Sequence, residues 1–160
     1  MKIENIFLTK ENLKKIMKID KSFYKNDILT LDWYLERYNE NHKALVLVNK
    51  KNQWVGYLVS VPITKELYMT ITNGVLVNDL YINPKHFLID SNYNYIVSVL
   101  IDEKYRDKGY GSKIIKYFFE SNSGKYCALT ITKGGYNLCL NQMNLWMKIN
   151  ESTFVFIKDK

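Results

Sequence analysis

The sequence predicts an α/β (α+β) protein in which short strands alternate with amphipathic helices. Runs of β-branched and aromatic residues indicate strands, and apolar residues at helical spacing lie between them. One unit stands out, in which a strong strand, a glycine-containing loop and a helix follow one another. The chain has 160 residues, 47% of them hydrophobic, which is enough to build the core of one domain spanning residues 1–160.

The first part of the chain is predicted to run strand, helix, helix, strand, strand. Residues 3–8 fit a short strand, after which Thr9 can cap a helix with apolar side chains at helical spacing. Residues 31–38 fit a second, shorter helix. The continuous apolar run 44–48 and the segment 54–61 are separated by a polar turn, so we expect them to pair as a hairpin.

The second part contains the strongest local signals. Residues 65–72 are compatible with a helix, and residues 93–101 form the strongest predicted strand, because they are rich in aromatic and β-branched side chains. A clear helix is predicted over 112–120, followed by another strand over 126–132. Gly134 and its neighbour open a last short helix, and two strands complete the chain.

Composition excludes several classes of protein. Two cysteines, Cys127 and Cys139, are too few for a disulfide scaffold or a four-cysteine zinc site. A run of about 18 consecutive apolar residues, which a membrane span needs, does not occur. The N-terminus lacks the apolar core of a secretory signal. We therefore expect a reduced, cytoplasmic protein that does not enter a membrane.

The net charge of +7 does not indicate a nucleic-acid-binding surface. The positive residues are lysines apart from Arg37 and Arg106, and the lysines are scattered without a basic block. The bias towards lysine, isoleucine, asparagine and tyrosine is typical of AT-rich coding. Residues that such a bias disfavours are expected where chemistry requires them, and Arg106, Gly109 and Gly111 are three of them within six positions.

The loop after the strongest strand has the properties of an anion site. Its sequence is RDKGYGS, from Arg106 to Ser112, and it leads directly into a helix. A helix N-terminus has unpaired N–H donors and a partial positive charge, and glycines allow its backbone to approach a phosphate closely. A Rossmann fingerprint would need a third glycine where Ile114 stands, and no P-loop string is present.

This segment resembles motif A of the GNAT superfamily of N-acetyltransferases, whose signature is R/Q-x-x-G-x-G/A. Arg106, Gly109 and Gly111 occupy the signature positions, and the strand before and the helix after also match. The resemblance covers most of the chain. It implies a mixed, mostly antiparallel central sheet of six to seven strands flanked by helices, in which the strands at 93–101 and 126–132 splay apart.

The resemblance also implies acetyl-CoA as the cosubstrate and a primary amine on a small molecule or peptide as the acceptor. The pyrophosphate would lie on backbone N–H groups of the loop, and the pantetheine would pair with the end of the preceding strand, with a backbone N–H around Leu100 donating to the thioester oxygen. The residues implied in cofactor binding are Val99, Leu100, Ile101, Arg106, Asp107, Lys108, Gly109, Tyr110, Gly111 and Ser112.

The C-terminal part departs from the family pattern, in which a tyrosine can protonate the departing CoA thiolate. One alignment sets residues 145–150 against the family's L-Y-E-K stretch. It puts Trp146 at the tyrosine position, where an indole cannot act as an acid, and it leaves only one strand before the chain ends.

The other alignment makes residues 136–142 the helix and residues 144–149 and 153–157 a hairpin. It is favoured because it completes the fold. It places Leu138 at the tyrosine position and leaves Tyr136 two residues away as the candidate general acid.

Other chemically active side chains are better explained by structure than by catalysis. His42 and His86 have no second ligand at metal spacing, so no metal site is predicted. Cys127 lies in an apolar strand and Cys139 in a helix, which favours buried, inert thiols. Aromatic and acidic residues that would suit a cationic amine gather in the segment that lines the family's acceptor site, although ordinary helix packing explains them equally well: Tyr24, Asp27, Asp32, Trp33 and Tyr34.

Two hypotheses follow for the function. The first is an N-acetyltransferase that moves an acetyl group from acetyl-CoA to a primary amine by direct transfer, without an acyl-enzyme. The alternative is a non-catalytic acyl-CoA-binding module of the same fold, which the missing tyrosine keeps open. The sequence does not distinguish a monomer from a homodimer.

Overall fold

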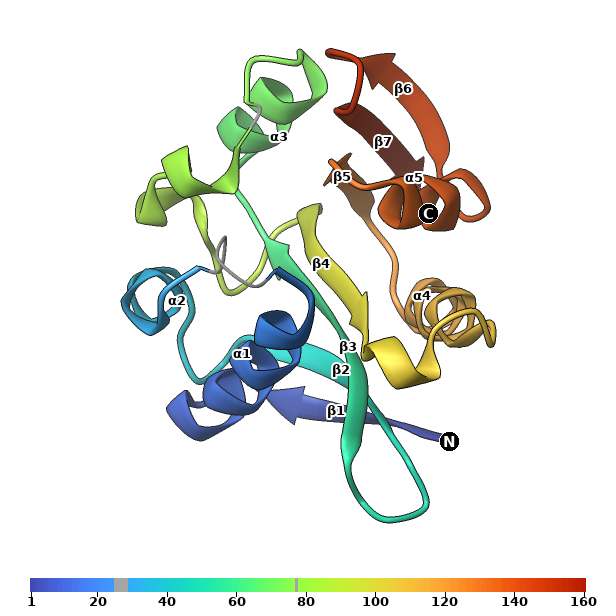
Figure 1. The fold of residues 1–160 in the computed structure, drawn as a ribbon. Coiled ribbons are helices and arrows are strands. Elements are labelled where there is room, and N and C mark those ends of the chain that lie inside the picture. Colours follow the sequence, from blue (N-terminus) through green and yellow to red (C-terminus); the bar gives the residue numbers. More distant parts are fainter. Residues whose placement is uncertain (25–28, 77) are drawn as a thin grey trace.

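A computed structural model describes residues 1–24, 29–76 and 78–160. In this part of the chain a seven-stranded sheet has the order β1-β2-β3-β4-β5-β7-β6 (Figure 1). The strands are β1 (Lys2–Phe7), β2 (Lys43–Val48), β3 (Trp54–Pro62), β4 (Tyr93–Ile101), β5 (Lys125–Thr130), β6 (Asn144–Lys148) and β7 (Phe154–Asp159). The α-helices are α1 (Lys10–Tyr24), α2 (Leu31–Arg37), α3 (Lys65–Thr72), α4 (Tyr110–Ser121) and α5 (Lys133–Leu140).

The sheet is antiparallel except where β4 and β5 pair in parallel. That pairing ends at Ile96, which lies opposite Ala128, although β4 continues to Ile101. The pairing of β3 with β4 shifts by one residue near this point, and such a bulge bends a strand. The two strands therefore diverge. The mixed, mostly antiparallel sheet and the splay that the sequence predicted are confirmed.

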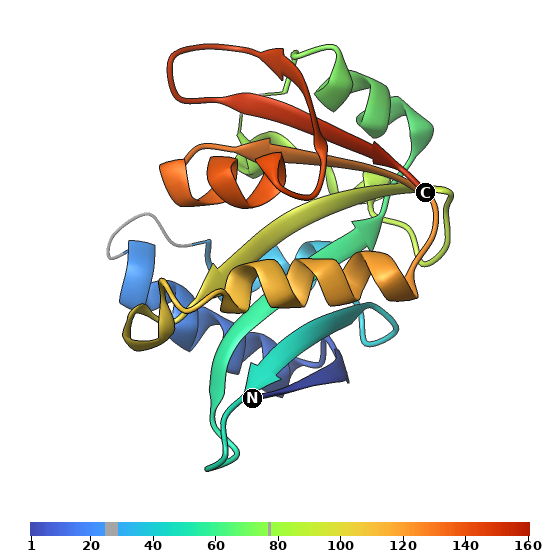
Figure 2. The ribbon, with the colours of Figure 1, turned by 90° about the vertical axis from the view of Figure 1, so that its right-hand side faces the viewer.

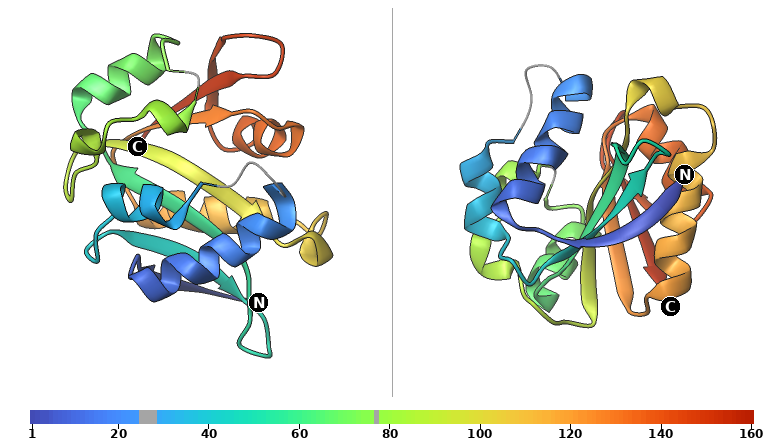
Figure 3. Two further views of the ribbon diagram at one scale, coloured as in Figure 1. Left: turned by 60° about the vertical axis from the view of Figure 1, so that its left-hand side comes forward. Right: turned by 90° about the horizontal axis from the view of Figure 1, so that it is seen from below.

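Helices cover both faces of the sheet and divide the core into two clusters. Helices α1 and α2 lie on one face and α4 on the other, as the right-hand view of Figure 3 shows. The cluster under α1, α2 and α3 includes Leu13, Tyr57 and Ile71. The second cluster lies under α4, which crosses the sheet in Figure 2, and under α5, and it includes Ile114 and Phe156.

The predicted elements recur with small shifts, and the alternative alignments of the C-terminus are resolved. Helix α5 is followed by the antiparallel pair β6–β7, so the alignment with a C-terminal hairpin is correct. Helix α4 begins at Tyr110, two residues before its predicted start, because Gly109 takes a left-handed conformation with φ of 74° and serves as the N-cap. Ser112 therefore lies within the first turn. Within the described ranges, no helix has the length and hydropathy needed to cross a membrane.

Candidate active site

A cavity of about 600 Å³ lies where β4 and β5 diverge. Its wall includes residues from both core clusters, among them Tyr57 and Val59 on the α1–α2 side and Leu138 and Cys139 on the α5 side. Leu138 also lies 3.5 Å from the position that a Cβ on Gly111 would occupy. The cavity therefore has walls on both faces of the sheet, and one of its lining side chains, Leu138, lies against the first turn of α4.

The N-terminus of α4 differs from those of the neighbouring helices in having no side-chain cap. Threonine hydroxyls accept a backbone N–H at the start of α2, α3 and α5, through Thr30, Thr64 and Thr132. At α4 the cap residue is Gly109, which has no side chain to offer. The first N–H groups of a helix have no intrahelical partner, so those of Tyr110 and the next two residues remain available to an anion.

The two basic residues of the loop have different positions. Arg106 donates from Nε to the carbonyl oxygen of Ile101 at 3.0 Å, and its guanidinium lies 4.4 Å from the centre of the Phe23 ring. Arg106 thus fixes the loop against the end of β4 and against α1. Lys108 is exposed and donates to the carbonyl oxygen of Lys104 at 3.2 Å. Of the two charges, that of Lys108 lies nearer to solvent.

The end of β4 has a free edge that faces the splay. Asp102 donates its N–H to Val55 on the β3 side at 2.9 Å. Because hydrogen bonding alternates along an antiparallel pair, Leu100 also directs its backbone groups to β3, whereas Val99 and Ile101 direct theirs to the splay. The carbonyl of Ile101 already accepts a hydrogen bond from Arg106, so the groups free to pair with an extended ligand are the N–H and carbonyl of Val99 and the N–H of Ile101.

Two carboxyl groups line the cavity on the α1–α2 side. Asp20 on α1 is 4% exposed and accepts hydrogen bonds from the hydroxyls of Tyr34, at 2.9 Å, and Tyr57. Asp79, in a short 3₁₀ turn after α3, accepts from the hydroxyl of Tyr95. Burial raises the pKa of Asp20 above its ordinary value and raises that of Asp79 to about 6.

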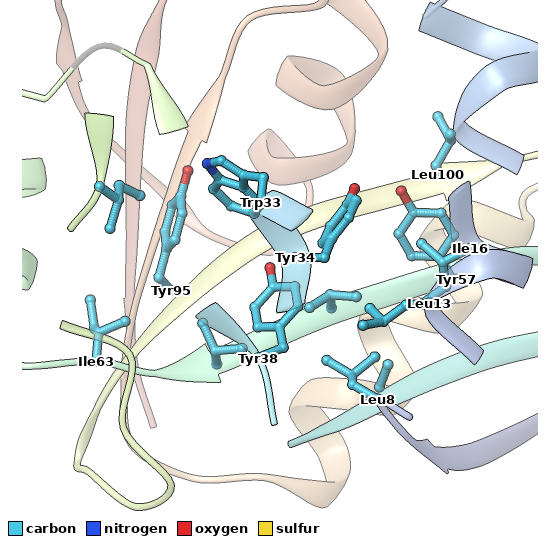
Figure 4. Packing of buried hydrophobic residues seen from close by; sticks show 14 of the residues in the cluster. Leu8, Leu13, Ile16, Trp33, Tyr34, Tyr38, Tyr57, Ile63, Tyr95 and Leu100 are labelled. Atoms are coloured by element: carbon cyan, nitrogen blue, oxygen red, sulfur yellow. The ribbon is translucent and has the colours of Figure 1, made fainter. Parts of the chain in front are cut away.

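Tyrosine hydroxyls gather around these carboxylates. Figure 4 shows Tyr34, Tyr38, Tyr57 and Tyr95 with their hydroxyls directed towards the same side of the cluster. The hydroxyl of Tyr38 is buried, and it has no hydrogen-bond partner within the described part of the chain. The hydroxyl of Thr130, on the wall formed by β5, is likewise without such a partner. The cavity thus presents acceptors that a bound polar ligand can use.

Of the five acceptor-side residues that the sequence indicates, some line the cavity and others do not. Tyr24 and Tyr34 line the cavity. Trp33 is buried against neighbouring aromatic rings, Asp32 is exposed, and Asp27 lies outside the described residues. The carboxylates that do reach the cavity, Asp20 and Asp79, were not named from the sequence.

The sequence contains a signal for one of these two carboxylates, that of Asp20. Asp20 continues the apolar face of α1, following Leu13 and Ile16 at helical spacing. An acidic residue on such a face is a candidate for a buried role. Asp79 has no comparable signal, because the segment around it has no regular pattern.

Tyr136 packs its ring against Phe154, with 4.6 Å between ring centres, and against Phe156. It is half-buried and is not among the residues that line the cavity, whereas Leu138, two positions along α5, is. Its assignment as the general acid stays a prediction.

The remaining candidates have structural partners. Cys127 and Cys139 are buried, which raises the pKa of the Cys139 thiol to about 12 and that of Cys127 still further. His42 is hydrogen-bonded to the carbonyl oxygen of Leu88 at 2.6 Å, and His86 to the hydroxyl of Thr64 at 2.7 Å. No grouping of three potential metal ligands occurs among the residues that the structure describes.

The comparisons with known proteins agree with this geometry. The model of the acetyltransferase (GNAT) family matches residues 13–128, so the chain belongs to the GNAT family of acetyltransferases. No curated relative matches the sequence.

Several solved structures are similar in fold. A GNAT-family acetyltransferase from Streptococcus agalactiae shares 12% identity, covering 99% of this chain and 95% of its own, with a TM-score of 0.65. NAA60 from Arabidopsis thaliana, solved with a bisubstrate analogue, shares 13% identity over 98% and 97% of the two chains, with a TM-score of 0.64. A structure described as a putative phosphinothricin N-acetyltransferase shares 13% identity over 98% and 96%, with a TM-score of 0.62. These likenesses show the fold.

The raised pKa of Asp79 predicts a pH-dependent cost in stability. The folded pKa of about 6 exceeds the ordinary 3.8, so ionisation opposes folding as the pH rises through this interval, and the cost is complete above pH 6. Asp79→Asn is expected to increase the free energy of unfolding by about 2 kcal/mol at pH 8 and to leave it unchanged below pH 4. Denaturant unfolding at the two pH values measures this, with the exposed Asp90→Asn as the matched control. Equal effects at both pH values would contradict it.

Proposed function

We propose that the protein transfers an acetyl group from acetyl-CoA to the nitrogen of a primary amine. The observation that supports this most strongly is the cavity that passes through the β4–β5 splay. On one side of it Leu138 lies against the first turn of α4, whose N-terminus is uncapped, and on the other lie the carboxylates of the buried Asp20 and the half-buried Asp79. Such an arrangement can hold an acyl-CoA on one side of the sheet and a cationic amine on the other.

The donor side is formed by the loop and the free edge of β4. The pyrophosphate binds the N–H groups from Asp107 to Ser112, with Lys108 contributing charge from the solvent side. The pantetheine pairs with Val99 and Ile101, and the N–H of Val99 donates to the thioester oxygen. Acetyl-CoA supplies the activated acetyl group. Arg106 acts on this side by holding the loop against Ile101.

Asp20 is the proposed proton acceptor for the incoming ammonium. Its carboxylate is connected through the Tyr57 hydroxyl to the hydroxyl of Ser98 on β4, at 3.1 Å between the two hydroxyl oxygens. Ser98 precedes Val99, so Asp20 belongs to the part of the cavity where transfer occurs. A carboxylate whose pKa is raised by burial is better matched to accept a proton from an amine.

Transfer is direct in this account. The nitrogen forms a bond to the acetyl carbon, the carbon–sulfur bond breaks, and the pair of electrons leaves with the CoA sulfur. Cys139 lines the cavity, but burial raises the pKa of its thiol to about 12, which leaves almost no thiolate at neutral pH. An acyl-cysteine intermediate is therefore not part of the proposal.

Tyr136→Phe tests the remaining assignment, protonation of the CoA thiolate by Tyr136. If the tyrosine is the acid, kcat falls by about 10²–10⁴-fold while the affinity for acetyl-CoA changes little. The phenylalanine keeps the packing against Phe154, so a structural effect is small. A loss below about threefold removes Tyr136 from the mechanism and leaves protonation to solvent.

A screen of amines tests the function itself. Acetyl-CoA is incubated with the protein and a library of small amines and peptide N-termini, and release of the CoA thiol is followed. Turnover with at least one amine is expected. Binding of acetyl-CoA without thiol release from any amine would support the alternative, a non-catalytic acyl-CoA-binding module.

A further inference from the structure

We propose that the acceptor is a small dication, an amine with a second cationic group, and that Asp79 binds the group that does not react. This inference rests on the proposed function and specifies its acceptor. It starts from a feature that an amine with one charge does not explain: the cavity contains two desolvated carboxylates, Asp20 and Asp79, rather than one.

Neither carboxylate has a cationic partner within the described residues. The ion pairs found there involve other acidic groups, and the described cavity wall includes no lysine or arginine. The partners of Asp20 and Asp79 are tyrosine hydroxyls. A buried charge that lacks an opposite charge costs stability, so two such carboxylates in one cavity indicate that the ligand supplies the cations.

The two carboxylates belong to different parts of the cavity. Asp20 is connected through Tyr57 to Ser98, in the segment of β4 that has left β5. Asp79 is bound to Tyr95, which lies opposite Cys127 where the two strands still pair. The reacting nitrogen therefore lies near Asp20, and the second cation lies near Asp79, away from the splay.

The wall between these positions suits a flexible chain with polar ends. Apolar side chains of Ile16, Val59 and Leu80 line it and can contact methylene groups. Tyr38 lies on the same cavity wall as both carboxylates, and its hydroxyl is buried and without a partner in the described structure. It can accept a hydrogen bond from an ammonium. A linear diamine satisfies these three features together.

The test compares diamines with monoamines of the same length. Thiol release from acetyl-CoA is measured with diaminobutane and diaminopentane, and with butylamine and pentylamine as probes that lack the second charge. The diamines are expected to have a kcat/KM on the order of 100-fold higher, because the second ammonium pairs with a buried carboxylate. Mass spectrometry is expected to find one acetyl group per diamine, since the product no longer offers two cations.

The variant Asp79→Asn tests whether the preference for diamines over monoamines depends on the Asp79 carboxylate. The ratio of diamine to monoamine kcat/KM is expected to fall to within about threefold in this variant and to stay near its original value in Asp90→Asn, an exposed site with the same change of charge. An undiminished ratio in Asp79→Asn overturns the role of Asp79. Equal kcat/KM for diamines and monoamines in the unmodified protein overturns the dication proposal while leaving N-acetyl transfer intact.

Thermal shift with each amine, in the presence of CoA, provides a readout independent of turnover. Diamines are expected to raise the Tm of the unmodified protein more than monoamines do. In Asp79→Asn the Tm increase caused by diamines is expected to be smaller than in the unmodified protein. If diamines stabilise the protein through Asp79 but no thiol is released, the proposed function fails and recognition of a dication stands. If diamines and monoamines shift the Tm of the unmodified protein equally, the proposed recognition of a dication is wrong.

Discussion

Replacing Gly109 by alanine and Gly111 by valine is expected to lower the affinity for acetyl-CoA by at least about 100-fold. At Gly109 an added Cβ would meet no protein atom within 4 Å and would point into open space beside the loop where the pyrophosphate is proposed to bind. The residue would also be strained, since φ is 74°. At Gly111 the added Cβ would lie in ordinary contact with Leu138 and Ile101, at 3.5 to 3.8 Å, and the valine methyl groups would add bulk beyond it. Isothermal titration with acetyl-CoA measures the loss.

Gly134→Ala is the matched control for this variant. Gly134 lies in the first turn of α5, has no protein atom within 4 Å of an added Cβ, and belongs to a helix whose N-terminus Thr132 already caps. Its affinity for acetyl-CoA is expected to be unchanged. The single variant Gly109→Ala, whose Cβ would meet no protein atom although its backbone would be strained, separates blocked binding from misfolding when its thermal unfolding is measured alongside. Unchanged affinity in a folded double variant would show that the α4 loop is not the phosphate site.

Asp20→Asn is expected to lower kcat by about 10²–10³-fold, because an amide cannot accept the proton that the ammonium must lose. The amide oxygen can still accept a hydrogen bond from Tyr34 or Tyr57, so the local packing is largely kept. The affinity for acetyl-CoA is expected to stay within about twofold, because Asp20 lies on the amine side of the splay. Steady-state kinetics with one reactive amine and titration with acetyl-CoA measure both quantities.

Asp32→Asn provides the comparison for Asp20→Asn. Asp32 comes from the same acceptor-side segment of the sequence but is exposed on α2, so its loss is expected to change kcat by less than about twofold. The pH dependence of the rate of Asp20→Asn distinguishes two roles of Asp20, accepting a proton and binding the amine. If raising the pH restores the rate of Asp20→Asn, the carboxylate removes a proton; if it does not, Asp20 acts only by holding the amine.

The donor side could be predicted from the sequence because its signals are local. A strand, a loop and a helix follow one another directly between Tyr93 and Ser121, and Gly109 and Gly111 mark the close approach of the backbone. The same local signals fixed most elements of the fold. Helix α4 begins two residues before the start that its apolar spacing predicts, because Gly109 in a left-handed conformation serves as its N-cap.

The acceptor side depends on contacts between distant segments, which a single sequence does not reveal. Asp20, Tyr57 and Asp79 come from α1, β3 and the turn after α3, and only the fold brings them to one cavity. Of the residues that the sequence indicates there, Tyr24 and Tyr34 line the cavity, whereas Asp32 and Trp33 occupy an exposed and a core position of a short helix. Tyr136 is two residues from the family's tyrosine position, and spacing along the sequence does not determine which way a ring on a short helix points.

The most direct test of the central claim is a single-turnover experiment with the protein in excess over acetyl-CoA and with a reactive diamine present. Mass spectrometry then follows the acetyl group on CoA, on the protein and on the amine nitrogen. The acetyl group is expected to pass from CoA to the amine, with one free thiol formed per acetylated amine and no acetyl group on Cys139 or Cys127. An acetyl group that remains on CoA, or that appears first on a cysteine, would contradict direct N-acetyl transfer across the splay.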